Sequence, residues 1–324
     1  MLLSLISLVA GLGLATGPAG APPAGPPLHK VAALKITILS TMLADQGMGE
    51  WGFSALVEVD GRRILFDTGL RPETVLQNAR ELGIDLSGVT DVVLSHHHGD
   101  HTGGLLALRR ELSKASPTAM SRIHVAPGIF LSRRHSGSEE EANPTIALKS
   151  AMEATGAVFV EHRKPEEIFP GVWLTGPVPR PNPERYWGPP ANIVTGSGVV
   201  PDSIPEDMSL LVNTDKGFVV VAGCGHAGTI NTVEYARHIL GTEPAYAVIG
   251  GLHLFAAPDS ALAWTAARLR SAQLGYLLGA HCTGIEAVFR IRDLAALDRK
   301  RAVVAAVGSS FDASKGINPL SLAQ

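Results

Sequence analysis

Four potential metal ligands lie within six residues of this sequence, between an apolar run and a pair of glycines: His96, His98, Asp100 and His101. The preceding run, Asp91–Ser95, contains adjacent valines and predicts a buried strand. Imidazole and carboxylate groups packed this closely at a strand end suit a divalent transition metal. The alternative is a polar loop whose histidines only cap the next helix, and it gives no reason for so many ligands in so short a stretch.

The spacing of these residues divides them into two groups. His96 and His98 are two apart, so in an extended segment they project the same way, while His97 projects the opposite way. Asp100 and His101 follow a glycine and can turn back toward a second position nearby. The motif therefore predicts a metal centre that needs further ligands from elsewhere in the chain.

Three later stretches have the same form, an apolar run that ends in glycine and histidine. They end in Cys224-Gly-His226, Gly250-Gly-Leu-His253 and His281-Cys282-Thr-Gly284. Ligand sites in open α/β sheets lie at the carboxyl ends of the strands, so four such strand ends predict one shared site. The other histidines lack this context and are interpreted as ordinary: His29, His124, His135, His162 and His238.

The rest of the chain alternates between strand and helix patterns. Strands are predicted over 34–40, 53–59, 64–67, 91–95, 123–126, 157–160, 172–175, 208–213, 218–222, 246–250, 276–280 and 302–307. Helices are predicted over 72–82, 104–112, 229–240, 260–274 and 285–293. Early hairpins followed by strand–helix alternation predict an α/β fold with mixed sheets and outer helices.

Composition limits the class of protein. The chain has 324 residues, of which 45% are hydrophobic and 18% charged, enough for one large domain or two small ones. The formal net charge of -3 argues against nucleic-acid binding driven by bulk charge, although it leaves a local basic groove open. Two cysteines do not make a disulfide scaffold. We expect a small-molecule substrate and no nucleic-acid partner, and the sequence leaves the oligomeric state undetermined.

Residues 1–27 are expected to lie outside the fold. The apolar run Leu2–Leu14 is too short for a stable membrane anchor, and the Pro/Gly/Ala-rich Gly17–Pro27 follows it. The segment resembles a signal peptide, but no Lys or Arg precedes His29. We expect export to the periplasm or the medium by an atypical signal, with no stable membrane span after processing. An uncleaved anchor, or a cytoplasmic protein with a misassigned start, is the alternative.

One segment breaks the strand–helix rhythm. Pro165–Pro205 holds ten of the 22 prolines and is predicted to be largely loop, either functional or an insertion without a role. Within it, Arg185 and Trp187 are candidate substrate-binding residues for an anionic or aromatic substrate. Upstream, Arg133-Arg134-His135 with Glu139–Glu141 is interpreted as a solvated polar loop that could border the site.

The motif His96-x-His98-x-Asp100-His101, preceded by Leu65-Phe-Asp67-Thr-Gly69, resembles the metallo-β-lactamase superfamily. Five further stretches look like its dihydropterin ribofuranosylaminobenzene-phosphate synthase-like branch: Glu50–Ser54, Asn78–Asp85, Gly223–Gly228, Gly250–His253 and His281–Gly284. The resemblance runs from roughly Leu34 to the C-terminus. It implies a four-layer αββα sandwich, here a single domain over residues 28–324, with metal at one edge of the two sheets.

The resemblance also implies roles for individual residues. A first metal would be held by His96, His98 and His226, and a second by Asp100, His101 and His281. Asp67 would support the metal loop through hydrogen bonds rather than bind metal itself. No Asp occurs between Val219 and Thr229, where most members carry a bridging carboxylate. Cys224 stands at that strand end, either as a bridging thiolate or as a small buried residue beside a mononuclear site.

The chemistry expected of such a site is hydrolysis. We expect zinc, as one or two ions, with iron or manganese as alternatives that use the same ligands. A zinc-bound water has a pKa of about 7 and attacks an ester. Asp100 is the candidate for orienting that water, and His253 for contacting the substrate or protonating the leaving group, unless His253 only bonds a neighbouring backbone.

The substrate class is less sharply defined. The helix that opens after His226 is expected to aim its N-terminal amides at the site, which slightly favours a phosphoester and an anionic substrate. A pterin-related synthase of the same branch is one alternative function. An iron-binding redox or sensor protein on the same fold is another.

Overall fold

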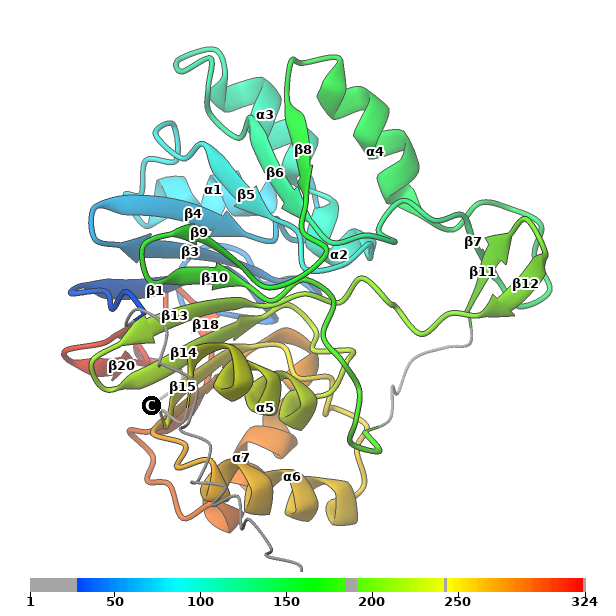
Figure 1. The fold of residues 1–324 in the computed structure, drawn as a ribbon. Coiled ribbons are helices and arrows are strands. Elements are labelled where there is room, and N and C mark those ends of the chain that lie inside the picture. The colour runs from blue at the N-terminus through cyan, green and yellow to red at the C-terminus, as the bar shows by residue number, and fades with distance from the viewer. Residues whose placement is uncertain (1–27, 185–190, 242–243, 323–324) are drawn as a thin grey trace, which may run out of the picture.

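Two β-sheets packed face to face form the centre of the molecule, and helices cover both outer faces (Figure 1). The computed structural model describes residues 28–184, 191–241 and 244–322. The four layers, helix, sheet, sheet and helix, are the αββα sandwich that the family resemblance implied.

The first sheet has the strand order β20-β19-β1-β3-β4-β5-β6-β8. Its strands are β1 (Leu34–Ser40), β3 (Ser54–Val59), β4 (Arg62–Phe66), β5 (Asp91–Val93), β6 (Arg122–Val125), β8 (Val158–Glu161), β19 (Ser310–Asp312) and β20 (Gly316–Asn318). The helices on its outer face are α1 (Thr74–Glu81), α3 (Leu105–Leu112) and α4 (Pro144–Glu153), and the short α2 (Gly99–Thr102) precedes α3.

The second sheet has the order β17-β16-β15-β14-β13-β10-β9. Its strands are β9 (Glu166–Phe169), β10 (Val172–Leu174), β13 (Leu210–Thr214), β14 (Gly217–Ala222), β15 (Ala245–Gly250), β16 (Tyr276–Gly279) and β17 (Ala302–Val304). Its outer helices are α5 (Thr229–Leu240), α6 (Asp259–Ser271) and α7 (Ile285–Leu294). A pair, β2 (Leu43–Ala44) and β18 (Ala306–Val307), lies apart from both sheets.

Side-chain alternation along the strands builds the layers. In β14, Val219 and Val221 face the core between the sheets, while Val220 and Ala222 face the helices. Because β14 is buried on both faces, its sequence reads as a continuous apolar run rather than an alternating one. Such a strand is identified in sequence by its length and its flanking glycines rather than by its periodicity.

Parallel pairing brings the functional loops to one edge. The run β4, β5, β6 and β8 is parallel, and so is the run β14, β15, β16 and β17. The loops that follow β4, β5, β14, β15 and β16 carry Asp67, the histidine motif, Cys224, His253 and His281. Parallel strands present their carboxyl ends on the same side, so these five loops converge.

The prediction that Pro165–Pro205 is largely loop missed three strands, whereas the strand predicted over 172–175 is present as β10. The segment contains β9 and β10, at the edge of the second sheet, and then β11 (Ala191–Thr195) and β12 (Gly198–Pro201). The last two pair with β7 (Arg133–His135) in a small sheet that projects from the body (Figure 1). Pro165 and Pro170 flank β9, and Pro201 ends β12, positions at which proline is tolerated. Neither strand alternates between buried and exposed residues, because β12 is exposed throughout and most of β9 is half-buried.

Other boundaries needed smaller corrections. The strand 34–40 and the helix 229–240 lie where they were predicted, whereas the run 302–307 is divided into β17 and β18. No helix among the described residues is long and apolar enough to cross a membrane. The segment interpreted as a signal peptide, residues 1–27, lies outside the described residues, so its role in export stays a prediction.

Gly250 supplies a test of how tightly the carboxyl edge is packed. Its φ is +113°, and a Cβ there would lie 1.9 Å from the carbonyl oxygen of Ala222. We expect Gly250→Ala to lower the free energy of unfolding by about 1–3 kcal/mol more than Gly61→Ala, because both substitutions strain a left-handed backbone but only the first forces a clash with the Ala222 carbonyl. Gly61 is a matched control, with φ +80° and nothing within 4 Å of a Cβ. If urea unfolding shows the same loss of free energy for both variants, the loops at the carboxyl ends of the strands can relax around the added methyl group.

Candidate metal centre

The first group of predicted ligands lies together. The ligand atoms of His96, His98 and His226 are all within 4.8 Å of one another. The rings of His96 and His226 are 4.6 Å apart between centroids, and those of His98 and His226 are 5.0 Å apart. Residues from the ends of β5 and β14 therefore form one triad, although they are 130 positions apart in sequence.

The second group also lies together. Ligand atoms of Asp100, His101 and His281 are within 4.8 Å of one another. An Asp100 carboxylate oxygen lies 3.2 Å from Nε2 of His281, and the other lies 3.9 Å from Nε2 of His101. Asp100 and His101 are carried by α2, the one-turn helix that begins after His98.

Cys224 lies between the two triads. Its Sγ falls within 4.8 Å of ligand atoms of His96 and His101 together, and also of His226 and His281. It is 3.1 Å from Nε2 of His101. A sulfur that reaches members of both triads occupies the place that a bridging ligand requires.

Cys282 adds a second thiol that the sequence analysis did not include among the ligands. Its Sγ lies 3.2 Å from Sγ of Cys224, and both cysteines are buried. Cys224, Cys282 and His281 together form a further group that could hold a metal ion. Cys282 could have been recognised as a candidate ligand because it directly follows His281 in the sequence.

Asp67 organises the histidines without joining either triad. Its Oδ2 accepts hydrogen bonds from the Ser95 hydroxyl at 2.7 Å and from Nδ1 of His101 at 2.7 Å, and its Oδ1 accepts from the Ser95 amide at 2.8 Å. The Ser95 oxygen in turn lies 2.9 Å from Nδ1 of His96. Since the Ser95 proton goes to Asp67, the oxygen accepts from His96. Both rings thus keep a proton on Nδ1 and direct Nε2 toward the centre, as metal-binding histidines do.

The residues present fit a divalent transition metal. Nε2 of His96 and Nε2 of His226 lie only 3.1 Å apart in a buried setting. Burial, and the neighbouring histidines, hold the pKa of His96 and of His226 well below the usual value, so both rings are neutral. Converging neutral imidazoles with an adjacent thiol are a good donor set for zinc, and they also serve iron.

The second triad carries opposite charges. Burial disfavours the charged form of Asp100, but the His101 and His281 rings outweigh it and hold the pKa of Asp100 well below its usual range. Burial likewise opposes the His101 cation, but the Asp67 and Asp100 carboxylates raise the pKa of His101 to about 9. A proton on His101 and a metal cation would occupy the same lone pair, so this triad would release a proton on binding a divalent metal.

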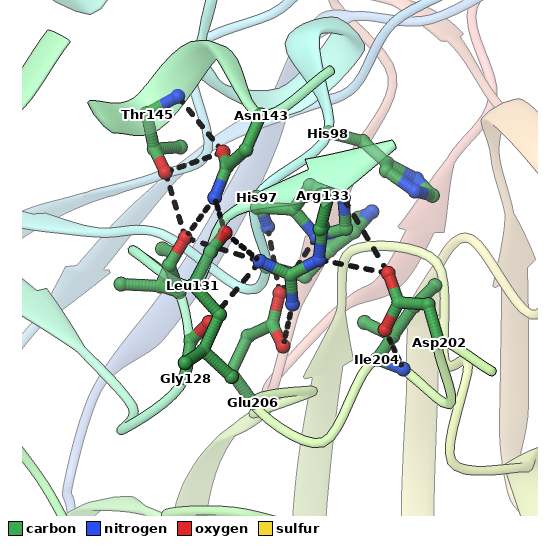
Figure 2. A network of polar contacts seen from close by, with 12 residues as sticks. His97, His98, Gly128, Leu131, Arg133, Asn143, Thr145, Asp202, Ile204 and Glu206 are labelled. Carbon is green, nitrogen blue, oxygen red and sulfur yellow. Dashed lines mark hydrogen bonds and ion pairs between the residues drawn. The ribbon is translucent and has the colours of Figure 1, made fainter. Parts of the chain in front are cut away.

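His97 points away from both triads and into a buried ion-pair network (Figure 2). Its Nδ1 lies 2.7 Å from Glu206, whose other oxygen accepts from Arg133 at 2.7 Å. Arg133 also donates to Asp202 at 2.7 Å and to carbonyl oxygens of the Gly128–Leu131 turn. The network ties the small β7–β11–β12 sheet to the histidine motif.

The interpretation of Arg133 as part of a solvated loop was therefore wrong. Its side chain is 1% exposed and is paired with two carboxylates. A buried guanidinium is tolerated only when its donors are satisfied in this way. This pairing could not be read from the residues near Arg133, because Asp202 and Glu206 lie about seventy residues later in the chain.

The argument for an anion at the amino end of α5 was also wrong. Glu184 accepts hydrogen bonds from the amides of Ile230 at 3.0 Å and Asn231 at 2.8 Å. Gly228, at the N-cap, has no side chain that could do so. The protein's own carboxylate therefore takes the place where a substrate phosphate was expected, and the reason to prefer a phosphoester is lost.

His253 lies beside the first triad, and its ligand atom lies within 4.8 Å of those of Cys224 and His226, so these three form a further group that could hold a metal ion. The His253 ring is 4.5 Å from that of His226 between centroids, and His253 has the left-handed φ of +51°. It lines a cavity of about 480 Å³ together with Asp100, His98, Cys224 and His281. Of the other predicted site residues, Arg185 and Trp187 lie outside the described residues.

Two motif residues act on the loops rather than in the centre. Glu50 is buried and accepts from the Ser40 hydroxyl and from the amides of Leu70 and Arg71, which fixes the turn after Asp67. Asn78 of α1 bonds both backbone groups of Met48. The stretch around Glu50 thereby shapes the loop that leads to the centre.

Comparison with known proteins agrees with this architecture. The family model described as metallo-beta-lactamase superfamily matches residues 52–125. The chain is 31% identical over 272 residues to 7,8-dihydropterin-6-methyl-4-(beta-D-ribofuranosyl)-aminobenzene-5'-phosphate synthase of Methanocaldococcus jannaschii, covering 80% of this chain and 91% of that protein. The chain therefore belongs to the metallo-β-lactamase superfamily, and within it to the branch of this synthase, as the motifs predicted.

Solved structures show the same fold. A metal-dependent hydrolase of the β-lactamase superfamily aligns with a TM-score of 0.68 and 27% identity, over 82% of this chain and 94% of that one. Zn²⁺-bound PqqB from Methylobacterium extorquens aligns with a TM-score of 0.51 and 16% identity, over 85% and 99%. The second likeness concerns the fold alone.

Neighbouring histidines give a matched test of the metal centre. We expect His98→Ala to lower the metal content of the purified protein, because the first triad loses one of three nitrogens. We expect His97→Ala to leave metal content close to that of the unaltered protein, since this side chain bonds Glu206 instead. Elemental analysis after gel filtration measures both. Equal metal in the two variants would contradict the assignment.

The buried Asp207 predicts a pH dependence of the protein's stability. It is 2% exposed, and burial raises its pKa to about 6 from 3.8, although it accepts the Ala227 amide. A raised folded pKa means that the folded state binds more protons, so this group's stabilisation is lost as pH rises from 3.8 through about 6. Relative to Asp207→Asn, the unaltered protein should lose up to about 3 kcal/mol across that window. Urea unfolding of both proteins in the presence of a chelator measures the free energy of unfolding at each pH. The same pH dependence in both proteins would contradict the raised pKa of Asp207.

Proposed function

We propose that this protein is a metal-dependent hydrolase of a small ester. The observation that supports this most directly is the pair of His and His/Asp triads around the Cys224 thiol, opening on a cavity of about 480 Å³. When bound, the metal acts as a Lewis acid that lowers the pKa of water and polarises the bond under attack. We propose zinc, as one or two ions, with iron or manganese as alternatives.

The proposed roles follow from charge and position. Asp100 is ionised and half-buried at the cavity, so it can orient a water and accept its proton. His253 lines the cavity and is in neither predicted triad, although it groups with Cys224 and His226, and we propose that it faces the leaving group rather than the metal. Trp51 and Phe255 are half-exposed, lie 5.7 Å apart between ring centroids, and border the same cavity.

The substrate is proposed to be a small molecule rather than a nucleic acid. Besides histidines, Arg133 is the one cation among the described residues that line this cavity, and it is paired with Asp202 and Glu206. Charge on a substrate would therefore meet the metal rather than a basic side chain. Anionic and neutral esters both remain candidates, and the earlier preference for phosphoesters is not retained.

A second candidate function is a synthase reaction like that named for the Methanocaldococcus jannaschii relative, with which the chain shares 31% identity. A third is iron-based redox or sensing, which the two adjacent thiols would suit. Metal analysis and absorbance separate the third from hydrolysis, because zinc sites are colourless. A synthase would leave phosphodiester, aryl-ester and lactam substrates intact.

His253→Asn tests the hydrolase proposal. Asn tolerates the left-handed backbone at this position, so the substitution removes the imidazole with little strain. We expect kcat to fall by about 10²-fold or more on whichever substrate of the panel is hydrolysed, the usual range for loss of an acid–base group. Metal content, measured on the same samples, should not change.

Two results would count against this assignment. An unchanged kcat would show that His253 is structural, and a parallel loss of metal would place it among the ligands. Failure of metal-loaded protein to hydrolyse any member of the panel would contradict the hydrolase proposal itself.

A further inference from the structure

A second cavity, of about 380 Å³, adjoins the metal centre at His226 and His253. His253 lines both this cavity and the one that opens on the two triads. A molecule in the second cavity therefore has one end against the metal centre. We call it the side pocket.

The walls of the side pocket are largely apolar. They come from the loop after β15 and from α6, and they include Leu252, Leu254, Pro258, Ala261 and Trp264. An engineered apolar cavity of about 150 Å³ takes one benzene ring, so this volume accommodates one or two rings. Pockets of this size and lining are typical of sites for small organic ligands.

Trp264 is held in place at this wall. The Arg268 guanidinium lies 5.6 Å from its ring centroid and donates to the side chain of Asn182 at 3.2 Å. Asn182 is bonded in turn to Asn231 and Glu234 of α5. The rim of the side pocket is thus tied to both α5 and α6, and the pocket exists before any ligand enters.

Glu184 gives the side pocket its polar end. Its two oxygens each accept one amide hydrogen bond from α5, and a Cβ on Gly228 would lie 2.2 Å from Oε2. A carboxylate has about four lone-pair sites, so roughly two remain for a ligand. The helix amides that would otherwise attract an anion are already bonded, and the free acceptor sites favour an N–H donor.

We propose that the side pocket binds the ring-bearing part of the substrate, a flat group of one or two rings that carries an N–H donor. The ring packs against Trp264 and the donor reaches Glu184. This placement leaves the reacting bond beside His226 and His253. The identity of that bond rests on the proposed hydrolase function; binding of the ring does not.

Binding is tested without turnover, by isothermal titration calorimetry of metal-loaded protein. The probes are 4-aminobenzamide, which carries N–H donors, and acetophenone, which has the ring and a carbonyl but neither an N–H donor nor an ester bond. We expect 4-aminobenzamide to bind at least about tenfold more tightly, and Trp264→Ala to weaken it about tenfold, equivalent to 1.4 kcal/mol. The control Arg270→Ala, exposed on the same helix, should bind as the unaltered protein does.

Ala261→Phe is the second variant, in case the loss of Trp264 impairs folding. Ala261 is half-exposed and lines the side pocket, so a larger side chain fills the pocket without entering the core. It should abolish binding of 4-aminobenzamide. Equal affinity of the two probes, or unchanged binding in both pocket variants, would overturn the proposal.

Kinetics separate this inference from the hydrolase proposal. With 4-nitrophenyl 4-aminobenzoate we expect Trp264→Ala to raise KM about tenfold, whereas KM for ethyl acetate, an ester without a ring, stays unchanged. Ring binding that depends on Trp264, without turnover of either ester, would support the side pocket and contradict ester hydrolysis. Turnover of both esters with no effect of Trp264→Ala or Ala261→Phe would support hydrolysis and overturn the side pocket.

Discussion

One buried carboxylate, that of Asp67, holds the carboxyl edge of the two sheets together. It is fully buried and accepts from Ser95 twice and from His101 once. A buried carboxylate is stable only when its oxygens are satisfied, so these donors are obligatory. The same atoms contact the second sheet, because a Cβ on Gly223 would lie 2.5 Å from Oδ2 of Asp67. Glycine at the end of β14 therefore lets the two sheets approach closely enough for His226 to reach His96.

Local patterns predicted the parts of this arrangement that depend on one strand end at a time. Each histidine group of the centre follows an apolar run and has glycine before or after it, and this can be read within about ten residues of sequence. The αββα fold followed from the family resemblance, since hairpins and strand–helix alternation by themselves indicated only an α/β class. Because the strands are parallel, their carboxyl ends lie at the same edge of the sheet.

Pairing across long sequence distances could not be read in this way. Glu206 meets His97 across 109 positions, and Glu184 caps a helix 46 positions later. Nothing in the neighbourhood of either glutamate distinguishes it from a surface residue. The small β7–β11–β12 sheet was missed for the same reason, because its central strand is paired with residues more than fifty positions earlier and its edge strand exposes Val199 and Val200.

Backbone strain at three of the loops is held by contacts within the protein. Asp67, His253 and His281 all have left-handed φ angles, of 55°, 51° and 47°. Each costs roughly 1–2 kcal/mol unless its surroundings hold it in place. For His281 the restraint is visible: its amide donates to the Thr41 hydroxyl, and Thr283 bonds Gly250 and Leu252 of the neighbouring loop. The loops of His253 and His281 are thus coupled through Thr283, so a change that frees one of them also loosens the other.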